Sequence, residues 1–150
     1  MGTRHRGTQT EVTALDAYIK LVRAVDSVSS RIHRHLDEAN LTITQFGVLE
    51  VLYHVGPLHQ RDLAAKLLKS GGNITLVIDN LEKQNLVKRH REPDDRRCIK
   101  VCLTEKGQQL IAQVFPLHVA AVVQEMSVLS ASEQEQLGYL CRRLGKQEAD

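Results

Sequence analysis

Aromatic residues are nearly missing from this chain. Its 150 residues include no tryptophan, three tyrosines and two phenylalanines, so a hydrophobic core has to be built from aliphatic side chains. Long apolar runs are missing too: none approaches the ~20 residues that cross a bilayer. The first twelve residues lack the apolar segment of a secretory signal. We therefore expect a soluble protein that makes no contact with a membrane.

Cysteine is equally scarce. The chain has three cysteines, an odd number, and no CxxC pair, which argues against a disulfide scaffold and favours a reducing, cytoplasmic location. The GxSxG, Walker, HExxH and glycine-rich nucleotide motifs are also absent. His33 and His35 stand two apart on a predicted helix and should diverge, which makes them poor joint metal ligands. The sequence thus predicts no enzyme, no metal site and no cofactor.

Charge is present but unevenly distributed, on a chain whose formal net charge is +2. Residues 83–100 contain seven lysines and arginines against three acids, whereas residues 108–150 contain three against five. A basic segment on a nearly neutral protein favours a polyanionic partner. A solvated charged loop is the alternative that charge alone leaves open.

Helical periodicity dominates the first third of the chain. Residues 11–38 repeat in alternating steps of three and four, the a/d pattern of one long helix. Its seam consists of Leu15, Tyr18, Val22, Val25, Ser29, Ile32 and Leu36. This seam is longer than one small domain covers, so we expect part of it to meet a partner chain. A second helix should follow Thr42, whose capping-box partner is Gln45. Its expected inward face is Phe46, Leu49, Leu52 and Val55.

Residues 59–82 are expected to form two short helices joined by a tight turn. The segments are "HQRDLAAKLL", the link "KSGG" and "NITLVIDNLEKQ". In the second helix, helical spacing places the apolar side chains on one buried face; they are Ile74, Val77, Ile78 and Leu81. The opposite face carries Asn73, Thr75, Leu76, Asn80 and Lys83. This arrangement is typical of a helix-turn-helix unit.

Residues 86–103 alternate like the two strands of a hairpin around the tip "EPDDRR". Pro93 is enough for a turn, so the charge cluster behind it needs another explanation. On the second strand, alternation separates two faces. Ile99, Val101 and Leu103 share one face, and Cys98, Lys100 and Cys102 share the other.

Two helices are expected in residues 105–146. Thr104 caps the first, and Pro116 predicts a kink or break near Phe115. Ser130 and Glu133 have capping-box spacing before the last helix. Its apolar stripe consists of Leu137, Leu140, Cys141 and Leu144. The fold class is therefore mainly α with a small β-hairpin.

Two segments carry a resemblance to a known family. A wing signature, Asp-x-Arg followed by five residues and Leu-Thr, falls on Asp95, Arg97, Leu103 and Thr104. The segment "SGGNITLVIDNLEKQNLVKR" looks like a recognition helix and the start of a wing. Over residues 11–146 the chain resembles the MarR family of winged helix-turn-helix transcriptional regulators.

The resemblance implies a winged helix-turn-helix head, with residues 59–82 as the helix-turn-helix and residues 86–103 as the wing. It implies N- and C-terminal dimerisation helices in residues 11–38 and 105–146. It also implies a homodimeric repressor on a pseudo-palindromic double-stranded DNA operator. A small aromatic or phenolic effector would bind in a pocket between the dimerisation helices and the head, and its binding would release the protein from DNA. Candidate polar groups of that pocket are Tyr18, Arg31, His54 and His118.

The expected DNA contacts follow from the chemistry of the two grooves. A recognition helix reads base edges in the major groove, and its N-terminal N–H groups suit phosphate. Small residues at that end allow close approach, and polar ones supply contacts; the candidates are Ser70, Gly71, Gly72, Asn73, Thr75 and Lys83. Leu76 departs from the basic or polar residue common there in the family. Further candidate phosphate anchors, each of which could equally be a solvated charge, are Arg61, Lys69, Lys88, Arg89 and Arg91.

The charged wing tip suits a narrow, electronegative minor groove, into which either Arg96 or Arg97 would insert. Arg97 holds the family's position, and Asp95 would orient Arg97 or tie the wing to the protein. Two alternatives stay open. One is a redox switch on the same scaffold, in which arginines lower the thiol pKa of Cys98. The other is a winged-helix module that binds protein instead of DNA.

Overall fold

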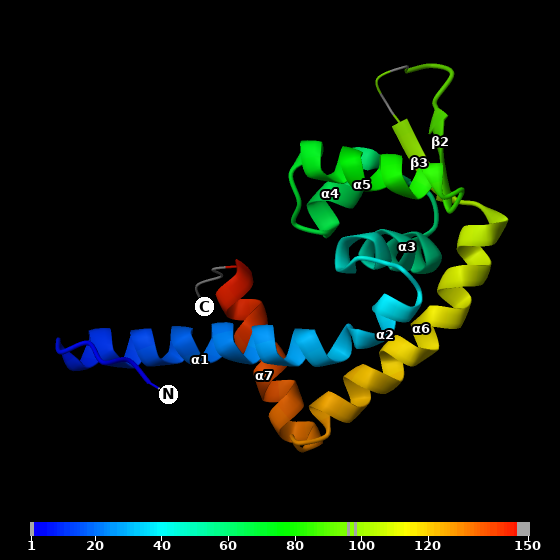
Figure 1. Ribbon diagram of the computed structural model, residues 1–150. Coiled ribbons are helices and arrows are strands. Elements are labelled where there is room, and N and C mark those ends of the chain that lie inside the picture. Colours follow the sequence, from blue (N-terminus) through cyan, green and yellow to red (C-terminus); the bar gives the residue numbers. More distant parts are fainter. Residues whose placement is uncertain (1, 96, 98, 147–150) are drawn as a thin grey trace. The chain divides into compact units, whose positions relative to one another are not determined.

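The computed structural model describes residues 2–95, 97 and 99–146, and its elements follow the expected order (Figure 1). They are α1 (Gln9–Ile32), α2 (Arg34–Glu38), α3 (Ile43–Val55), β1 (Leu58–His59), α4 (Gln60–Lys66), α5 (Gly71–Lys83), β2 (Val87–Arg91), β3 (Ile99–Leu103), α6 (Glu105–Met126) and α7 (Ala131–Lys146). The mainly α fold with a small β-sheet is confirmed. The described chain forms two compact units, here called the head (residues 33–118) and the helical unit (residues 2–32 and 119–146).

The head is organised around an aliphatic core. Buried side chains come from α2, α3, α4, α5, β2, β3 and α6; the most enclosed are Leu36, Val48, Leu49, Leu63, Ile74, Ile78, Leu81, Val87, Val101 and Ile111. Among the buried side chains of the described residues, Phe46 alone is aromatic. The expectation of an aliphatic core is therefore confirmed.

Capping residues fix where the helices of the head begin. Thr42 and Gln45 form the expected reciprocal capping box at the start of α3. At α6, the Thr104 hydroxyl accepts a hydrogen bond from the Gly107 N–H at 3.0 Å. A Cβ at Gly107 would collide with the Leu86 carbonyl oxygen, so glycine lets α6 start directly against the wing. Val55, expected to face inward on α3, is exposed because it precedes the helix end at Gly56.

The wing has three strands and not two. Its antiparallel order is β1-β3-β2, with Leu58 opposite Val101 on one side of β3 and Arg89 opposite Val101 on the other. β1 has two residues, too few for alternation to reveal it from the sequence. Through β1, the wing is hydrogen-bonded to the chain immediately before α4.

The prediction of one continuous helix over residues 11–38 was wrong, and a break near Phe115, one of the two outcomes expected from Pro116, does not occur. The single helix over residues 11–38 is broken at His33, so that α1 ends at Ile32 and α2 begins at Arg34. In contrast, α6 has no break at Pro116. Proline removes the hydrogen bond to the carbonyl four residues earlier, which here belongs to Ala112. Both residues are exposed, so water can satisfy that carbonyl.

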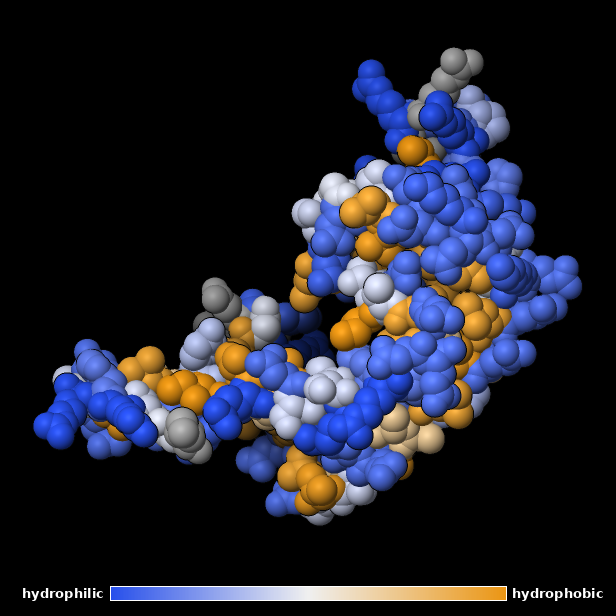
Figure 2. All heavy atoms as spheres, viewed as in Figure 1, coloured by the Kyte–Doolittle hydropathy of each residue, from blue (hydrophilic) through white to orange (hydrophobic). Residues whose placement is uncertain are grey.

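The helical unit lacks a comparable core. No residue of α1 or α7 is buried, and apolar side chains are visible along α1 in Figure 2. The capping box of Ser130 and Glu133 at α7 is confirmed, and Arg31 pairs with Glu125 at 2.7 Å. Among the described residues, no single helix is long and apolar enough to cross a membrane. By length and composition alone, α6 and α7 taken together, a pair bent by 103°, could cross one.

Candidate nucleic-acid interface

Helices α4 and α5 form the predicted helix-turn-helix. The inner face of α5 is anchored in the core by Ile74, Ile78 and Leu81. Its outer face is exposed, with the Leu76 side chain 63% accessible. In the turn before α5, Leu68 has a φ of 52°, the left-handed conformation that ends α4. One face of the second helix is therefore fixed by packing, and the other is available to a partner.

The start of α5 combines an N-cap with small residues. The Ser70 hydroxyl accepts a hydrogen bond from the Asn73 N–H at 3.2 Å. A Cβ added at Gly71 or Gly72 would meet no heavy atom within 4 Å. The backbone at this end is therefore open to close approach, and the remaining N–H groups of the first turn favour an anion.

The Thr75 hydroxyl is hydrogen-bonded within the protein, which limits the further hydrogen bonds that it can form. Its hydroxyl donates to the Gly71 carbonyl at 2.8 Å and accepts from the Gln60 side-chain amide at 2.7 Å. A hydroxyl has one proton to donate. In this conformation Thr75 can only accept a further hydrogen bond, which suits a base amino group and not a phosphate.

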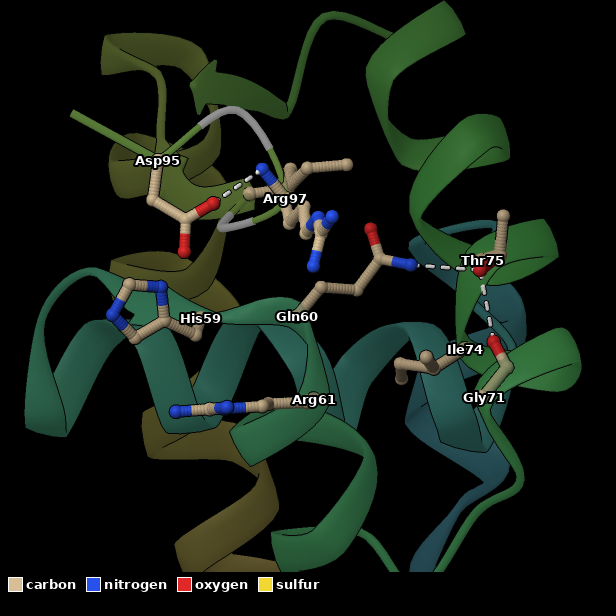
Figure 3. A pocket seen from close by; sticks show the side chains of 9 residues that line it. His59, Gln60, Arg61, Gly71, Ile74, Thr75, Asp95 and Arg97 are labelled. Carbon is tan, nitrogen blue, oxygen red and sulfur yellow. Dashed lines mark hydrogen bonds between the residues drawn. The ribbon is translucent and has the colours of Figure 1, made fainter. Parts of the chain in front are cut away.

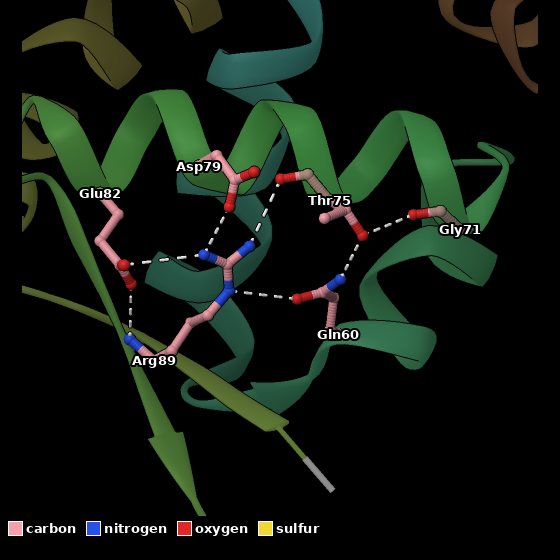
Figure 4. Close-up of polar contacts among 6 residues, drawn as sticks. All are labelled: Gln60, Gly71, Thr75, Asp79, Glu82 and Arg89. Carbon is pink, nitrogen blue, oxygen red and sulfur yellow. Dashed lines mark hydrogen bonds and ion pairs between the residues drawn. The ribbon is translucent and has the colours of Figure 1, made fainter. Parts of the chain in front are cut away.

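Arg89 lies at the centre of a polar network that joins the wing to both helices (Figure 4). Its guanidinium pairs with Asp79 at 2.7 Å and with Glu82 at 3.6 Å. It also donates to the Thr75 carbonyl and to the Gln60 side chain, both at 3.3 Å. The backbone N–H of Arg89 donates to Glu82 as well, at 3.2 Å.

These contacts tie the Arg89 side chain to α4 and α5. Its side chain is 20% exposed, and its donors are directed at α4 and α5. In this conformation the Arg89 guanidinium is therefore engaged within the protein, and its expected contact with phosphate stays untested. The sequence did contain a signal: Asp79 and Glu82 share one edge of α5, where acids would repel DNA unless a cation neutralised them.

The wing tip is ordered by Asp95. Its carboxylate accepts a hydrogen bond from the Arg97 backbone N–H at 2.9 Å (Figure 3). This short-range bond shapes the turn, as aspartate commonly does two residues before an N–H group. Arg97 is exposed. Arg96 and Cys98, the other candidates at the tip, lie outside the described residues.

A hollow of about 540 Å³ lies between the helix-turn-helix and the wing. Figure 3 shows its labelled side chains converging from α4, α5 and the wing. It is lined by His59, Gln60, Arg61, Gly71, Ile74, Thr75, Asp95, Arg97 and Ile99. The hollow thus brings four predicted α5 and wing residues together: Gly71, Thr75, Asp95 and Arg97. Lys83 is exposed on the last turn of α5, beyond the hollow.

The four predicted effector residues fall into two pairs. Tyr18 and Arg31 lie on α1 of the helical unit. Tyr18 is 64% exposed, and Arg31 pairs with Glu125 and donates to the Ser27 hydroxyl. His54 and His118 lie in the head, where both rings contact Phe115 at centroid distances of 4.5 and 6.4 Å.

His118 is also the centre of a histidine cluster. Its ring centroid lies 6.0 Å from that of His33 and 5.4 Å from that of His35. Burial, followed by the charges of His35 and His33, lowers the pKa of His118 below its usual value. The expectation that His33 and His35 diverge overlooked the helix break at His33. Within the described chain, no group of three or more His, Cys, Asp or Glu side chains is arranged to hold a metal ion.

A second hollow lies within the head beside this cluster. It has a volume of about 330 Å³, and its walls include Phe46, Glu50, Lys69, His33 and His118. Apolar and aromatic walls with a few charged groups are the usual lining of a small-molecule site.

Comparisons with known proteins agree with this geometry. The MarR family pattern matches residues 41–99, which span α3, the helix-turn-helix and most of the wing. The transcriptional regulator MhqR of Bacillus subtilis (strain 168) is 37% identical over 132 residues, covering 88% of this chain and 91% of its own length.

Two solved structures share the fold. The S. aureus MepR–DNA complex superposes with a TM-score of 0.79 at 24% identity, covering 87% of this chain and 98% of that one. NadR in complex with 4-hydroxyphenylacetate gives a TM-score of 0.74 at 24% identity, covering 99% and 100%. The winged helix-turn-helix geometry, the family pattern over it and the similarity to MhqR over 88% of this chain together show that the chain belongs to the MarR family of transcriptional regulators.

Proposed function

We propose that the chain is a homodimeric repressor that binds a pseudo-palindromic DNA operator, with α5 in the major groove and the wing tip in an adjacent minor groove. The observation that carries this proposal is the position of Arg97. It borders the same hollow as the N-terminal turn of α5, whose outer face is exposed. One DNA duplex in contact with that surface would meet both elements. The MepR–DNA complex, which has the same fold, supports this reading.

Each predicted contact residue then has a distinct role. The backbone at Ser70, Gly71 and Gly72 approaches a phosphate, and Asn73 reads a base edge. Lys83 pairs with a phosphate at the far end of α5. In the wing, Arg97 enters the minor groove and Asp95 holds the tip in shape. Thr75 contributes as an acceptor, and Arg89 holds α5 and the wing in register without touching DNA.

The helical unit supplies the dimer interface. Its apolar side chains on α1 and α7 are exposed in one chain. Burying them against a second copy removes apolar area from water, at roughly 25 cal/mol per Å². A two-fold dimer would present two heads to successive major grooves of one operator. We place this activity in the cytoplasm, which agrees with the reduced cysteines expected from the sequence.

Release of the operator is proposed to follow binding of a small aromatic or phenolic effector. Support comes from the hollow beside His118, whose Phe46 wall suits a ring and whose Lys69 suits an acidic group. NadR, which has the same fold, is solved with 4-hydroxyphenylacetate. Since Lys69 immediately precedes Ser70 at the start of α5, a ligand there would touch the segment that leads into the recognition helix.

Selection of duplexes from a random pool, followed by titration at several salt concentrations, tests the proposal. We expect an inverted repeat to be enriched, and the logarithm of the affinity to fall steeply with the logarithm of salt concentration. Lys83→Ala should weaken binding to all duplexes and flatten that slope by about one unit. Arg97→Ala should weaken operator binding most where A/T pairs lie under the wing. A protein without duplex affinity would be a protein-interaction module instead.

A further inference from the structure

The outer face of α5 presents an apolar side chain at its centre. Leu76 is 63% exposed, although Ile74, Ile78 and Leu81 already fill the inner face of the 13-residue helix. A single exposed leucine is common on protein surfaces and means little by itself. The position of this one is what counts, because the proposed function places it against DNA.

Helical spacing aligns Leu76 with the other outward residues. Positions three and four apart share a helix face, which groups Leu76 with Gly72, Asn73, Asn80 and Lys83. At Gly72, a Cβ would meet nothing within 4 Å, so this end of the ridge can approach a partner closely. Leu76 follows one turn later, where an inserted helix comes nearest to the base edges.

Two polar neighbours of Leu76, Thr75 and Asp79, are engaged within the protein. Thr75 donates to Gly71 and accepts from Gln60, and Asp79 pairs with Arg89. These contacts hold Thr75 and Asp79 toward α4 and β2. Leu76 projects from the same stretch of helix toward solvent, so a duplex seated there meets an aliphatic side chain.

The chemistry of the groove then restricts what Leu76 can recognise. A leucine side chain neither donates nor accepts hydrogen bonds, and most groups on the major-groove edges are donors or acceptors. The exception is the 5-methyl group of thymine. We propose that Leu76 is a specificity-determining residue that packs against a thymine 5-methyl group in each half of the operator. This inference rests on the proposed function, since it requires α5 to occupy the major groove.

The test replaces thymine with deoxyuridine, which removes the methyl group and leaves every hydrogen-bonding group in place. Operator duplexes selected by the wild-type protein are substituted one thymine position at a time, symmetrically in both halves. Affinities are measured by fluorescence titration at fixed salt. Loss of one buried methyl should cost about fourfold in affinity per half-site, or roughly 15-fold for the symmetric pair.

The decisive variant is Leu76→Ala. It should bind the thymine and deoxyuridine duplexes equally at one position, while Asn73→Ala, the matched control on the same ridge, should still prefer thymine there. Because Leu76 is exposed, its replacement should leave the thermal unfolding curve unchanged. Leu76→Gln, which introduces a long but polar side chain, should also bind the thymine and deoxyuridine duplexes with equal affinity.

The outcomes separate this inference from the function it rests on. If an operator is selected but no deoxyuridine penalty disappears in Leu76→Ala, the assignment of Leu76 is wrong and the DNA-binding function stands. If Leu76→Ala and Asn73→Ala lose the same penalty, recognition of the methyl group does not belong to Leu76. If the wild-type protein selects no duplex, the proposed function and this inference both fail.

Discussion

The head and the helical unit differ in how far their apolar side chains are buried. In the head, five helices and the wing enclose side chains such as Leu49, Leu63 and Ile78, each of which has no exposed surface. In the helical unit, neither α1 nor α7 has a buried residue, and leucines at the same helical spacing stay accessible. The same periodic pattern therefore accompanies a core in one region and an exposed apolar stripe in the other. If that stripe is the proposed dimer interface, the head should be stable by itself, whereas the helical unit should need a second copy.

The largest expected effect comes from charging the apolar stripe of α7. We expect Leu140→Glu with Leu144→Glu to convert the dimer to monomer and to abolish operator binding at concentrations where the wild type is saturated. A buried leucine contributes about 1.5–3 kcal/mol, so two changes in each copy should weaken dimerisation more than about a hundredfold. Sedimentation equilibrium at micromolar concentration measures the change.

The control for that double change lies in the head. Leu68 is 92% exposed in the turn before α5, so Leu68→Glu makes the same substitution on an accessible leucine of the other unit. It should leave the protein dimeric. A wild-type protein that sediments as a monomer, or a charged α7 that still dimerises, would contradict the contrast between the two units.

The second largest effect is expected in the core of the head. Leu49 of α3 is fully buried, and Leu49→Ala should lower the free energy of unfolding by about 2–5 kcal/mol through lost burial and the cavity left behind. Urea denaturation monitored by circular dichroism measures it. Leu76→Ala, the same change on the exposed face of α5, should shift stability by less than about 0.5 kcal/mol. Equal losses in the two variants would mean that α5 is not oriented as described.

Arg89→Lys tests whether the head positions its own DNA-binding elements. A lysine cannot pair with Asp79 and also reach the Thr75 carbonyl and Gln60, because it lacks the planar fork of the guanidinium. We expect operator affinity to fall about tenfold while the salt slope stays unchanged, since the net charge is preserved. Fluorescence titration at several salt concentrations measures both quantities.

A second substitution separates positioning from phosphate contact. Arg89→Gln removes the charge, and it should lower operator affinity further with the salt slope again unchanged. A slope reduced by about one unit would show instead that Arg89 pairs with a phosphate. Lys88→Gln, which removes one positive charge from the exposed side of the same strand, is the matched control for the loss of charge.

What could be predicted from the sequence was mostly local. The capping boxes at Thr42 and Ser130, and the buried face of α5, depend on residues three or four apart, and all were confirmed. The features that were missed depend on distant partners. Arg89 looks like one of several bases in a charged run, and only the fold brings Asp79 and Gln60 to it.

The same limit explains the errors within the helices. The break at His33 interrupts a seam whose spacing continues across it, because Leu36 packs into the head while residues up to Ile32 belong to the helical unit. Periodicity records that a residue is apolar, and not which of two cores it enters. The predicted DNA contacts and effector residues remain predictions, since their partners are molecules and not other parts of the chain.

The smallest expected effect concerns the histidine cluster at one end of the head. The pKa of His118 is lowered from its usual 6.5, first by burial and then by the charges of His35 and His33. Near and below pH 6.5 the unfolded chain therefore binds more protons than the folded head, and linkage requires the head to lose stability as the pH falls. The loss should begin near pH 6.5 and level off once folded His118 is also protonated. Glu50 and Lys69 line the same hollow as His118, but the shift in the pKa of His118 comes from burial and from His35 and His33.

His118→Gln should flatten this part of the stability profile between pH 7 and pH 5, because it removes the group whose protonation the fold resists. His90→Gln, an exposed position on β2, should follow the wild-type profile. Urea midpoints of the wild type and both variants, measured at half-unit steps of pH, supply the comparison. If the wild-type and His118→Gln profiles run parallel down to pH 5, His118 does not couple protonation to the stability of the head. If they converge as the pH falls, the cost of protonating His118 is the change in the separation of the two curves between pH 7 and pH 5.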